Sequence, residues 1–285
     1  MTASARRRQV RDILEGGACV HPGSVHDPIS ARIAEELGFE IGMFAGSTAS
    51  LTVLGAPDLI VLTLSEFADQ ARRICRAADL PLMVDADHGY GNALNVMRTV
   101  QELENAGVAA MSIEDTDLPR PFAAPKPRLV PLEEGVGKVQ AALAARTDPA
   151  TVIFARTGAA SITGMEDALG RTRAYSLTGA DGLFLTGVTT RDQLDALAAV
   201  ATIPLVLGTL SDELADRAYL AARGVRIALQ GHQPFQASVQ ALYATLKALR
   251  EGTPPKALQN LAPPALMKRL SREAEYEAAT RDFLG

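Results

Sequence analysis

Short apolar runs alternate with helix-like segments eight times along this chain, and no other feature constrains its fold as strongly. The runs are continuous instead of alternating with polar residues, as expected of parallel strands that are covered by helices. Eight successive strand-and-helix units predict a (β/α)8 TIM-type barrel of the α/β class. The expected strands are 18–20, 40–44, 82–84, 109–113, 151–155, 182–185, 204–207 and 225–229.

Several of the expected helices carry signals for their first residues. Asp27 and Pro28 have the types preferred at an N-cap and at the first helical position. Thr63 and Glu66 have the spacing of a capping box, and Asn92 can cap the helix after the third strand. Further helices are expected at 133–145, 165–177, 190–200, 211–222 and 236–250, with one at 6–15 before the barrel.

A doubly wound open sheet is the alternative fold. It is disfavoured because no Gly-x-Gly-x-x-Gly motif follows the first expected strand. We expect residues 1–252 to form the barrel as one catalytic domain. Residues 253–285 begin with a Pro-Pro pair and continue as a charged helical stretch, 264–283. These extra C-terminal helices are expected to pack on a neighbouring subunit of a homo-oligomer, which we expect to be a homotetramer.

The composition argues against several classes of protein. A net charge of -5 provides no basic field for nucleic acid. No apolar run reaches the roughly 18 residues needed to cross a bilayer. The basic cluster Arg6-Arg7-Arg8 lacks the apolar segment of a signal peptide, so we expect it to be solvated. Cys19 and Cys75 form no metal-type pair, and we expect them to be packing residues in a cytoplasmic protein.

Two carboxylates follow the third expected strand, in the stretch Asp85-Ala86-Asp87-His88-Gly89-Tyr90-Gly91-Asn92. An isolated Asp-x-Asp pair is usually a turn. Two like charges that are buried together are costly unless a cation neutralises them. Mg2+ prefers oxygen ligands and commonly takes one or two carboxylates. The stretch therefore indicates a metal site if other polar residues lie beside it.

Such residues are expected at the rim of the barrel, because the active site of this fold lies at the C-terminal ends of the strands. The rim positions are Ser47, Asp85, Asp87, Glu114, Arg156 and His232, with Asp58 in the loop after the second strand. Together they indicate a site for a metal and an anion. Each also has a simpler interpretation: Arg156 can pair with Glu114, the Glu114-Asp115 pair can be solvated, and His232 can cap a helix. His88 and Tyr90 either cover the pocket or support the loop.

These motifs resemble the phosphoenolpyruvate mutase/isocitrate lyase superfamily. The matching segments occur in order along most of the barrel. They are Gly46-Ser47, Asp58, the stretch from Asp85 to Asn92, Ser112-Ile113-Glu114-Asp115 and Ala155-Arg156-Thr157. Within the superfamily, the acidic stretch, the Ile-Glu-Asp-Thr segment and Gly231-His232 are most similar to the bacterial oxaloacetate decarboxylase family.

The resemblance implies Mg2+-dependent decarboxylation of oxaloacetate, or of a close 2-oxo-4-carboxylate, to pyruvate and CO2. The implied reaction passes through a metal-stabilised enolate. The resemblance also allows Mn2+ in place of Mg2+. The implied metal-binding residues are Asp85, directly, and Asp58, Asp87 and Glu114, largely through bound water. The implied substrate-binding residues are Gly46, Ser47, Arg156 and His232, of which the last two are also the implied catalytic residues.

Departures from the superfamily pattern bear on the subclass. Its lyases carry a Lys-Lys-Cys-Gly-His segment after the fourth strand, whereas residues 117–124 here contain no cysteine. Isocitrate and methylisocitrate lyase chemistry is therefore disfavoured. Leu210 and Gly158 stand where Tyr and a polar residue are common, which leaves the exact substrate open. The alternatives are a carbon-carbon lyase or a phosphonate or 2-oxo acid hydrolase of the same superfamily, and a non-catalytic 2-oxo acid binding protein.

Overall fold

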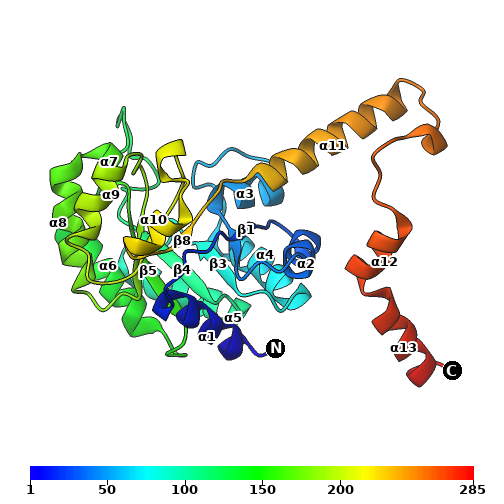
Figure 1. The fold of residues 1–285 in the computed structure, drawn as a ribbon, viewed down its shortest axis with the longest axis horizontal. Coiled ribbons are helices and arrows are strands. Elements are labelled where there is room, and N and C mark those ends of the chain that lie inside the picture. The colour runs from blue at the N-terminus through cyan, green and yellow to red at the C-terminus, as the bar shows by residue number, and fades with distance from the viewer. The chain divides into compact units, whose positions relative to one another are not determined.

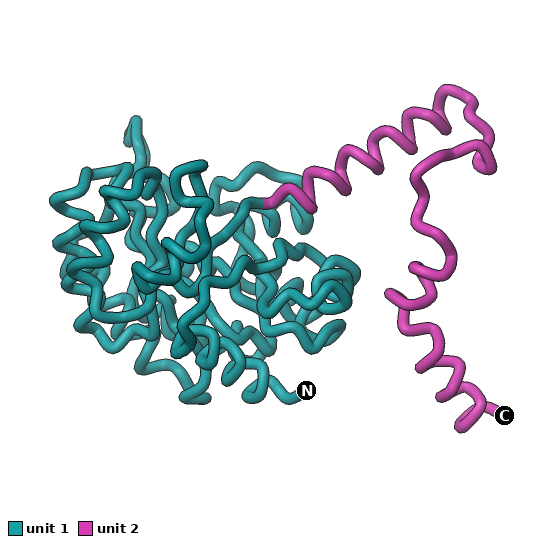
Figure 2. The backbone as a smooth tube through the Cα atoms, viewed as in Figure 1, with its two compact units in different colours: residues 1–231 teal, residues 232–285 magenta.

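A computed structural model describes all 285 residues of the chain. Its contacts divide the chain into two compact units, residues 1–231 and residues 232–285 (Figure 2). The first unit holds all eight strands and the second holds only helices. The domain boundary at residue 252, and the packing of residues 253–285 on a neighbouring subunit, remain predictions.

Eight parallel strands form one sheet in chain order (Figure 1). They are β1 (Gly23–Ser24), β2 (Gly42–Phe44), β3 (Leu82–Asp85), β4 (Ala110–Glu114), β5 (Val152–Thr157), β6 (Gly182–Leu185), β7 (Leu205–Leu207) and β8 (Val225–Ala228). The sheet closes on itself through Val20. Its N–H donates to the Arg226 carbonyl at 2.9 Å, and its carbonyl accepts from the Ala228 N–H at 3.0 Å. The predicted (β/α)8 barrel is thereby confirmed.

The first strand lies later in the chain than the sequence predicted. Residues 18–20 were the expected strand, but only Val20 pairs with β8, and β1 is Gly23–Ser24. Pro22 stands between the two segments, and a proline has no N–H to contribute to a ladder. A Cβ added at Gly23 would lie 3.1 Å from the Ala34 Cβ, so the chain packs closely against the first barrel helix here.

The first unit contains most of the predicted helices, together with short ones that the sequence did not predict. Their bounds are α1 (Ala3–Glu15), α2 (Pro28–Glu36), α3 (Gly46–Ala49), the π-helical η1 (Ser50–Leu54), α4 (Leu64–Ala77), α5 (Ala93–Ala106), α6 (Leu132–Ala145), α7 (Ala159–Ile162), α8 (Met165–Ser176), α9 (Arg191–Ala198), the 3-10 turn η2 (Asp212–Leu214) and α10 (Arg217–Ala222). Asp27, Thr63 and Asn92 cap α2, α4 and α5, each within a capping box. The helix expected at 211–222 is instead split, because the Asp216 carboxylate caps α10.

The second unit consists of α11 (Gln233–Arg250), the 3-10 turn η3 (Pro255–Ala257), α12 (Pro264–Ser271) and α13 (Glu273–Phe283). The single helix expected at 264–283 is broken at Arg272, whose φ of 57° is left-handed. The extra C-terminal helices are therefore present, but in two pieces. None of the helices in the chain combines the length and the apolar character that crossing a membrane requires.

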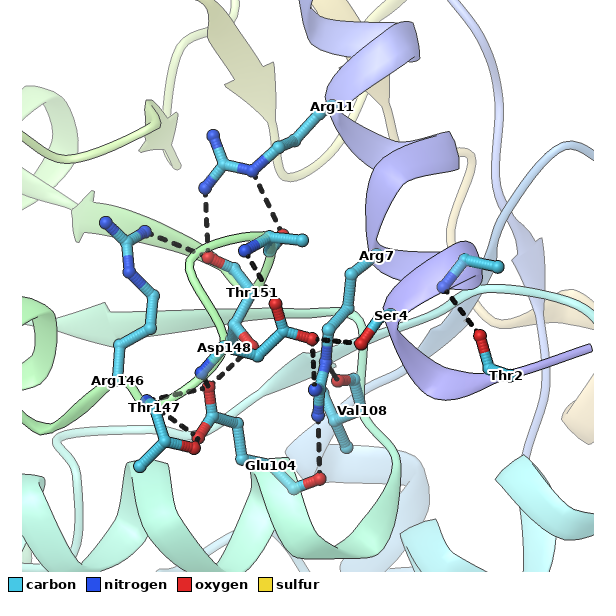
Figure 3. Close-up of polar contacts among 12 residues, drawn as sticks. Thr2, Ser4, Arg7, Arg11, Glu104, Val108, Arg146, Thr147, Asp148 and Thr151 are labelled. Atoms are coloured by element: carbon cyan, nitrogen blue, oxygen red, sulfur yellow. Dashed lines mark hydrogen bonds and ion pairs between the residues drawn. The ribbon is translucent and has the colours of Figure 1, made fainter.

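Two of the basic residues in α1 are buried, so the prediction of a solvated cluster was wrong for them. Arg6 is 8% and Arg7 6% exposed, while Arg8 is exposed as expected. Arg7 donates to the Glu104 carbonyl at 2.7 Å and pairs with Asp148 at 2.8 Å (Figure 3). Arg6 donates to two carbonyls at the end of α4. These guanidinium groups satisfy carbonyls that a helix leaves unpaired at its C-terminus. The sequence alone does not show which helix ends lie beside α1.

Apolar side chains fill the barrel interior. The inner cluster includes Ile41, Met43, Met83, Val152, Phe154, Phe184, Val206 and Ile227. Cys19 and Cys75 are buried among apolar neighbours of the outer clusters. Burial raises the pKa of the Cys19 thiol to about 11 and that of Cys75 to about 12. Both thiols are therefore protonated packing residues, as predicted.

Candidate active site

The ends of three neighbouring strands bring one arginine and two carboxylates together. Asp85 is the last residue of β3, Glu114 is the last residue of β4, and Arg156 lies opposite Glu114 on β5. The Arg156 guanidinium contacts the Asp85 carboxylate and pairs with Glu114 at 3.1 Å. The pair between Arg156 and Glu114 given by the simpler interpretation is therefore present, but Arg156 contacts Asp85 as well.

The loop after β3 turns a further carboxylate toward this group. The Asp87 N–H donates to Asp85 Oδ1 at 3.1 Å, and the Asp87 carbonyl accepts from the Glu114 N–H at 2.8 Å. Asp87 has a left-handed φ of 49°, which Asp tolerates better than most residues. A Cβ added at Gly46 would lie 2.9 Å from Asp87 Oδ1. Gly46, directly after β2, therefore leaves the room in which the Asp87 carboxylate lies.

These groups line a cavity of about 380 Å3. Its acidic part consists of Asp58, Asp85, Asp87 and Glu114 beside Arg156. The loop after β4 forms a second wall with Thr116, Asp117, Leu118, Arg120, Pro121, Lys126, Pro127 and Arg128. A third wall consists of Gly158, Ser161, Ile162 and Thr186. A Cβ at Gly158 would lie 3.1 Å from Thr186 Oγ1, so the glycine keeps this wall open.

Burial and crowding destabilise the ionised carboxylates of the cavity. Burial, followed by the charge of Asp85, raises the pKa of Asp58 and raises that of Asp87 well above its ordinary value. Burial raises the pKa of Glu114 to about 7, although Arg156 opposes the shift. Asp85 and Glu114 share the Arg156 guanidinium, and a divalent cation would relieve the repulsion among the four carboxylates.

The donor set fits a hard divalent cation. All four side chains offer oxygen only, which Mg2+ prefers, and Mg2+ keeps several waters when a protein binds it. No three of the carboxylates converge on one point, because the Arg156 guanidinium lies between Asp85 and Glu114. The arrangement is therefore compatible with one direct carboxylate contact and with water between the cation and the others.

Not every predicted residue reaches the cavity. Ser47 lies in α3 directly after Gly46, is half-buried, and is not part of the cavity wall. His232 occupies the N-cap position of α11 and belongs to the second unit, so its role remains a prediction. His88 and Tyr90 are also absent from the cavity wall; Tyr90 packs near the Phe67 ring, with centroids 6.4 Å apart. For both residues, the choice between covering the pocket and supporting the loop remains a prediction.

Asp115, beside Glu114, is not solvated. It is 2% exposed, and its carboxylate accepts from Arg171 at 2.9 Å and from the Tyr175 hydroxyl at 2.8 Å. Both partners come from α8, on the outside of the sheet. Consecutive residues of a strand point to opposite faces, so Glu114 faces the cavity and Asp115 the helix layer.

The sequence interpretation did not assign the basic residues of the loop after β4. Arg120, Lys126 and Arg128 all line the cavity, and Arg128 pairs with Asp117 at 2.6 Å. Their density between residues 116 and 131 was the available signal.

The barrel is closed and carries a cavity lined by carboxylates and an arginine at its strand ends. These features define the broad class, a (β/α)8-barrel enzyme with a site for a cation and an anion. The chain belongs to the phosphoenolpyruvate phosphomutase family, whose profile matches residues 11–250.

Relatives of known name agree with this family. An oxaloacetate decarboxylase of Bradyrhizobium sp. (strain BTAi1 / ATCC BAA-1182) is 60% identical over 284 residues, which is 100% of this chain and 99% of the relative. The crystal structure of phosphonopyruvate hydrolase with oxalate and Mg2+ has a TM-score of 0.87 at 29% identity and covers 100% of both chains. Oxaloacetate acetylhydrolase with 3,3-difluorooxalacetate has a TM-score of 0.86 at 28% identity over 98% of this chain and 97% of the other.

Proposed function

We propose that this chain is an enzyme that decarboxylates oxaloacetate, releasing pyruvate and CO2. The observation that carries the proposal is the contact between Arg156 and Asp85 within a cavity that is also lined by the carboxylates of Asp58, Asp87 and Glu114. The oxaloacetate decarboxylase relatives, 55–60% identical over nearly the full chain, support the same activity. A close 2-oxo-4-carboxylate is the other substrate that we propose to test. The lyase, hydrolase and binding-protein alternatives are not favoured.

We infer that the enzyme uses a divalent cation, and that this cation is Mg2+, with Mn2+ as a substitute. The oxygen-only donor set supports this choice, as does the Mg2+ bound in phosphonopyruvate hydrolase. Asp85 is proposed to hold the cation directly, with Asp58, Asp87 and Glu114 acting through water. When bound, the cation supplies a Lewis acid for the oxygens of a 2-oxo acid.

Arg156 has the properties of an anion-binding residue. Its side chain is half-buried at the rim, and the carboxylates beside it keep the guanidinium charged. A guanidinium can bind a substrate carboxylate through two parallel hydrogen bonds and can stabilise negative charge that develops nearby. We propose that the Gly46-Ser47 backbone and the Ser47 hydroxyl fix the C1 carboxylate. His232 is proposed to bind the ketone side or to deliver a proton.

The reaction requires no covalent nucleophile from the chain. Loss of CO2 leaves an electron pair on the carbon next to the ketone, and a proton then replaces the lost carboxyl group. Both cysteines are buried with raised pKa values, so neither is a nucleophile of this site. The electrostatic stabilisation from buried charged groups is therefore the main contribution that the cavity can make.

We further propose that the protein is a cytoplasmic homotetramer. The surface of α11 supports an oligomer. This helix has no buried residue and exposes one apolar stripe at helical spacing, formed by Val239, Leu242, Tyr243 and Leu246. A cytoplasmic location is supported by the two cysteines of the chain, which are unpaired thiols.

One assay tests the activity. Purified protein with Mg2+ is given oxaloacetate, and pyruvate and CO2 are followed against two controls, Mg2+ without protein and protein with excess EDTA. We expect release of pyruvate and CO2 in equal amounts, well above the metal-only rate, and its loss in EDTA. Full activity in EDTA would reject the metal requirement. Oxalate or glyoxylate as the product, with no CO2, would favour a hydrolase or lyase instead.

A further inference from the structure

Two of the cations that line the cavity have no carboxylate beside them. Four cationic side chains form part of its wall, namely Arg156 on β5 and Arg120, Lys126 and Arg128 on the loop after β4. Arg156 is shared between two carboxylates, and Arg128 pairs with Asp117 at 2.6 Å. Arg120 and Lys126 are exposed and form no ion pair. Their charges are therefore available to an anion that enters the cavity.

The loop that carries these two cations has a defined shape. Its arms are joined at the base by an antiparallel bridge between Thr116 and Leu129. Residues 121–124 form a turn in which the last N–H donates to the first carbonyl at 3.1 Å, and this turn reverses the chain. Arg120 precedes the turn and Lys126 follows it, so the two cations stand on different arms and line the same cavity.

Each of the two cations stands between prolines. The sequence contains Pro119-Arg120-Pro121 and Pro125-Lys126-Pro127. A proline fixes its own φ, and it restricts the residue before it to extended conformations. The backbone beneath each cation therefore has few alternative conformations. An anion held by these side chains orders the loop at a smaller entropic cost than an anion held by a flexible loop.

The rest of the cavity offers a second anionic group little positive charge. One wall carries no charged side chain and consists of Gly158, Ser161, Ile162 and Thr186. The acidic part contains one cation, Arg156, which already contacts carboxylates. A four-carbon 2-oxo acid carries one carboxylate beside its ketone and a distal carboxylate on the other side of it. If the divalent cation and Arg156 serve the ketone end, Arg120 and Lys126 are the cations left for the distal group.

We propose that Arg120 and Lys126 bind the distal carboxylate of a four-carbon 2-oxo acid and so select dicarboxylic over monocarboxylic ligands. The inference rests on the proposed function for the kind of ligand. Because both side chains are exposed, each contributes modestly, and salt weakens the contribution by screening the charges.

The test compares two dianions by calorimetric titration of the full-length protein with saturating Mg2+. 3,3-Difluorooxalacetate has a distal carboxylate, whereas oxalate has two adjoining carboxyl groups and no distal one. We expect Arg120→Gln combined with Lys126→Gln to weaken binding of 3,3-difluorooxalacetate by about ten-fold and to leave oxalate binding unchanged. Arg120→Lys combined with Lys126→Arg retains both charges and should keep most of the affinity. Arg8→Gln combined with Arg173→Gln removes two exposed charges that do not line the cavity and is the matched control.

Several outcomes overturn the inference. Equal weakening of both ligands would show a general effect of charge on dianions, and unchanged 3,3-difluorooxalacetate affinity would show no effect at all. Failure of wild type to bind 3,3-difluorooxalacetate would also overturn it. Arg120→Ala combined with Lys126→Ala is measured in parallel, and failure of both neutral double variants to fold would show that the two cations serve the fold instead. If wild type does not decarboxylate oxaloacetate, the proposed function fails, while the two titrations still decide whether these cations bind a distal carboxylate.

Discussion

At the scale of single residues, the cavity is organised by a shared guanidinium. Arg156 contacts Asp85 and pairs with Glu114, so neither carboxylate has the arginine to itself. Asp85 also accepts hydrogen bonds from the Asp87 N–H and from the Ser112 hydroxyl, which fix the orientation of its Oδ1 atom. Asp85 therefore connects Arg156 with the loop that carries Asp87.

Replacing Asp85 tests this dependence. We expect Asp85→Ala to abolish Mg2+-dependent decarboxylation, with a loss of at least about a hundred-fold in kcat/KM, because the proposed direct ligand and the partner of Arg156 disappear together. The thermal midpoint should remain close to that of wild type, since the substitution removes a crowded charge. Pyruvate formation and circular dichroism give the two readouts. Asp117→Ala, which removes an acid of the outer wall, should lose far less activity. Equal losses in the two variants would contradict the assignment.

At the scale of elements, strand register places the residues that the sequence identified. Because adjacent strands are parallel, the C-terminal ends of β3, β4 and β5 meet at one edge of the sheet. There Asp85 pairs with Ser112, and Glu114 pairs with Arg156. The sequence therefore predicted the barrel, its capped helices and most of its acidic rim. It did not predict the burial of Arg6 or the outward direction of Asp115, because both depend on which helix packs against a given strand end or helix end.

The contact between the end of β2 and the loop after β3 gives a prediction at this scale. Gly46→Ala places a methyl group 2.9 Å from Asp87 Oδ1, so we expect the Asp87 carboxylate to turn away. A side-chain rotation costs little stability, but it would disturb the proposed cation site, and kcat/KM should fall by about ten-fold or more.

Gly137→Ala is the matched control for that variant. A Cβ at Gly137 meets nothing within 4 Å, and alanine should stabilise the interior of α6 by roughly 0.5–1 kcal/mol with no change in turnover. Denaturant unfolding and steady-state kinetics measure both variants. Normal Mg2+ dependence in Gly46→Ala would show that the Asp87 carboxylate does not need its observed position.

At the scale of the whole molecule, the acidic cavity links pH, cation binding and stability. The folded chain raises the pKa of Glu114 to about 7, whereas an unfolded glutamate titrates near ~4.3. The folded state therefore holds the Glu114 proton more tightly than the unfolded state does. This contribution to stability is fully present at pH values below the pKa of the unfolded chain. It is lost as the pH rises through about 7. Above that pH, the ionised carboxylates destabilise the metal-free fold and favour a cation.

Thermal unfolding with and without Mg2+ measures this linkage. A cation that binds only the folded state raises the unfolding midpoint, and it competes with the proton for the same carboxylates. We therefore expect Mg2+ to raise the midpoint more at pH 8 than at pH 5.5. Glu114→Gln, which cannot ionise, should be more stable than wild type at pH 8 without Mg2+. The rise of its midpoint caused by Mg2+ should differ less between pH 5.5 and pH 8. If Mg2+ raises the midpoint of wild type by the same amount at pH 5.5 and at pH 8, cation binding does not displace a proton from Glu114.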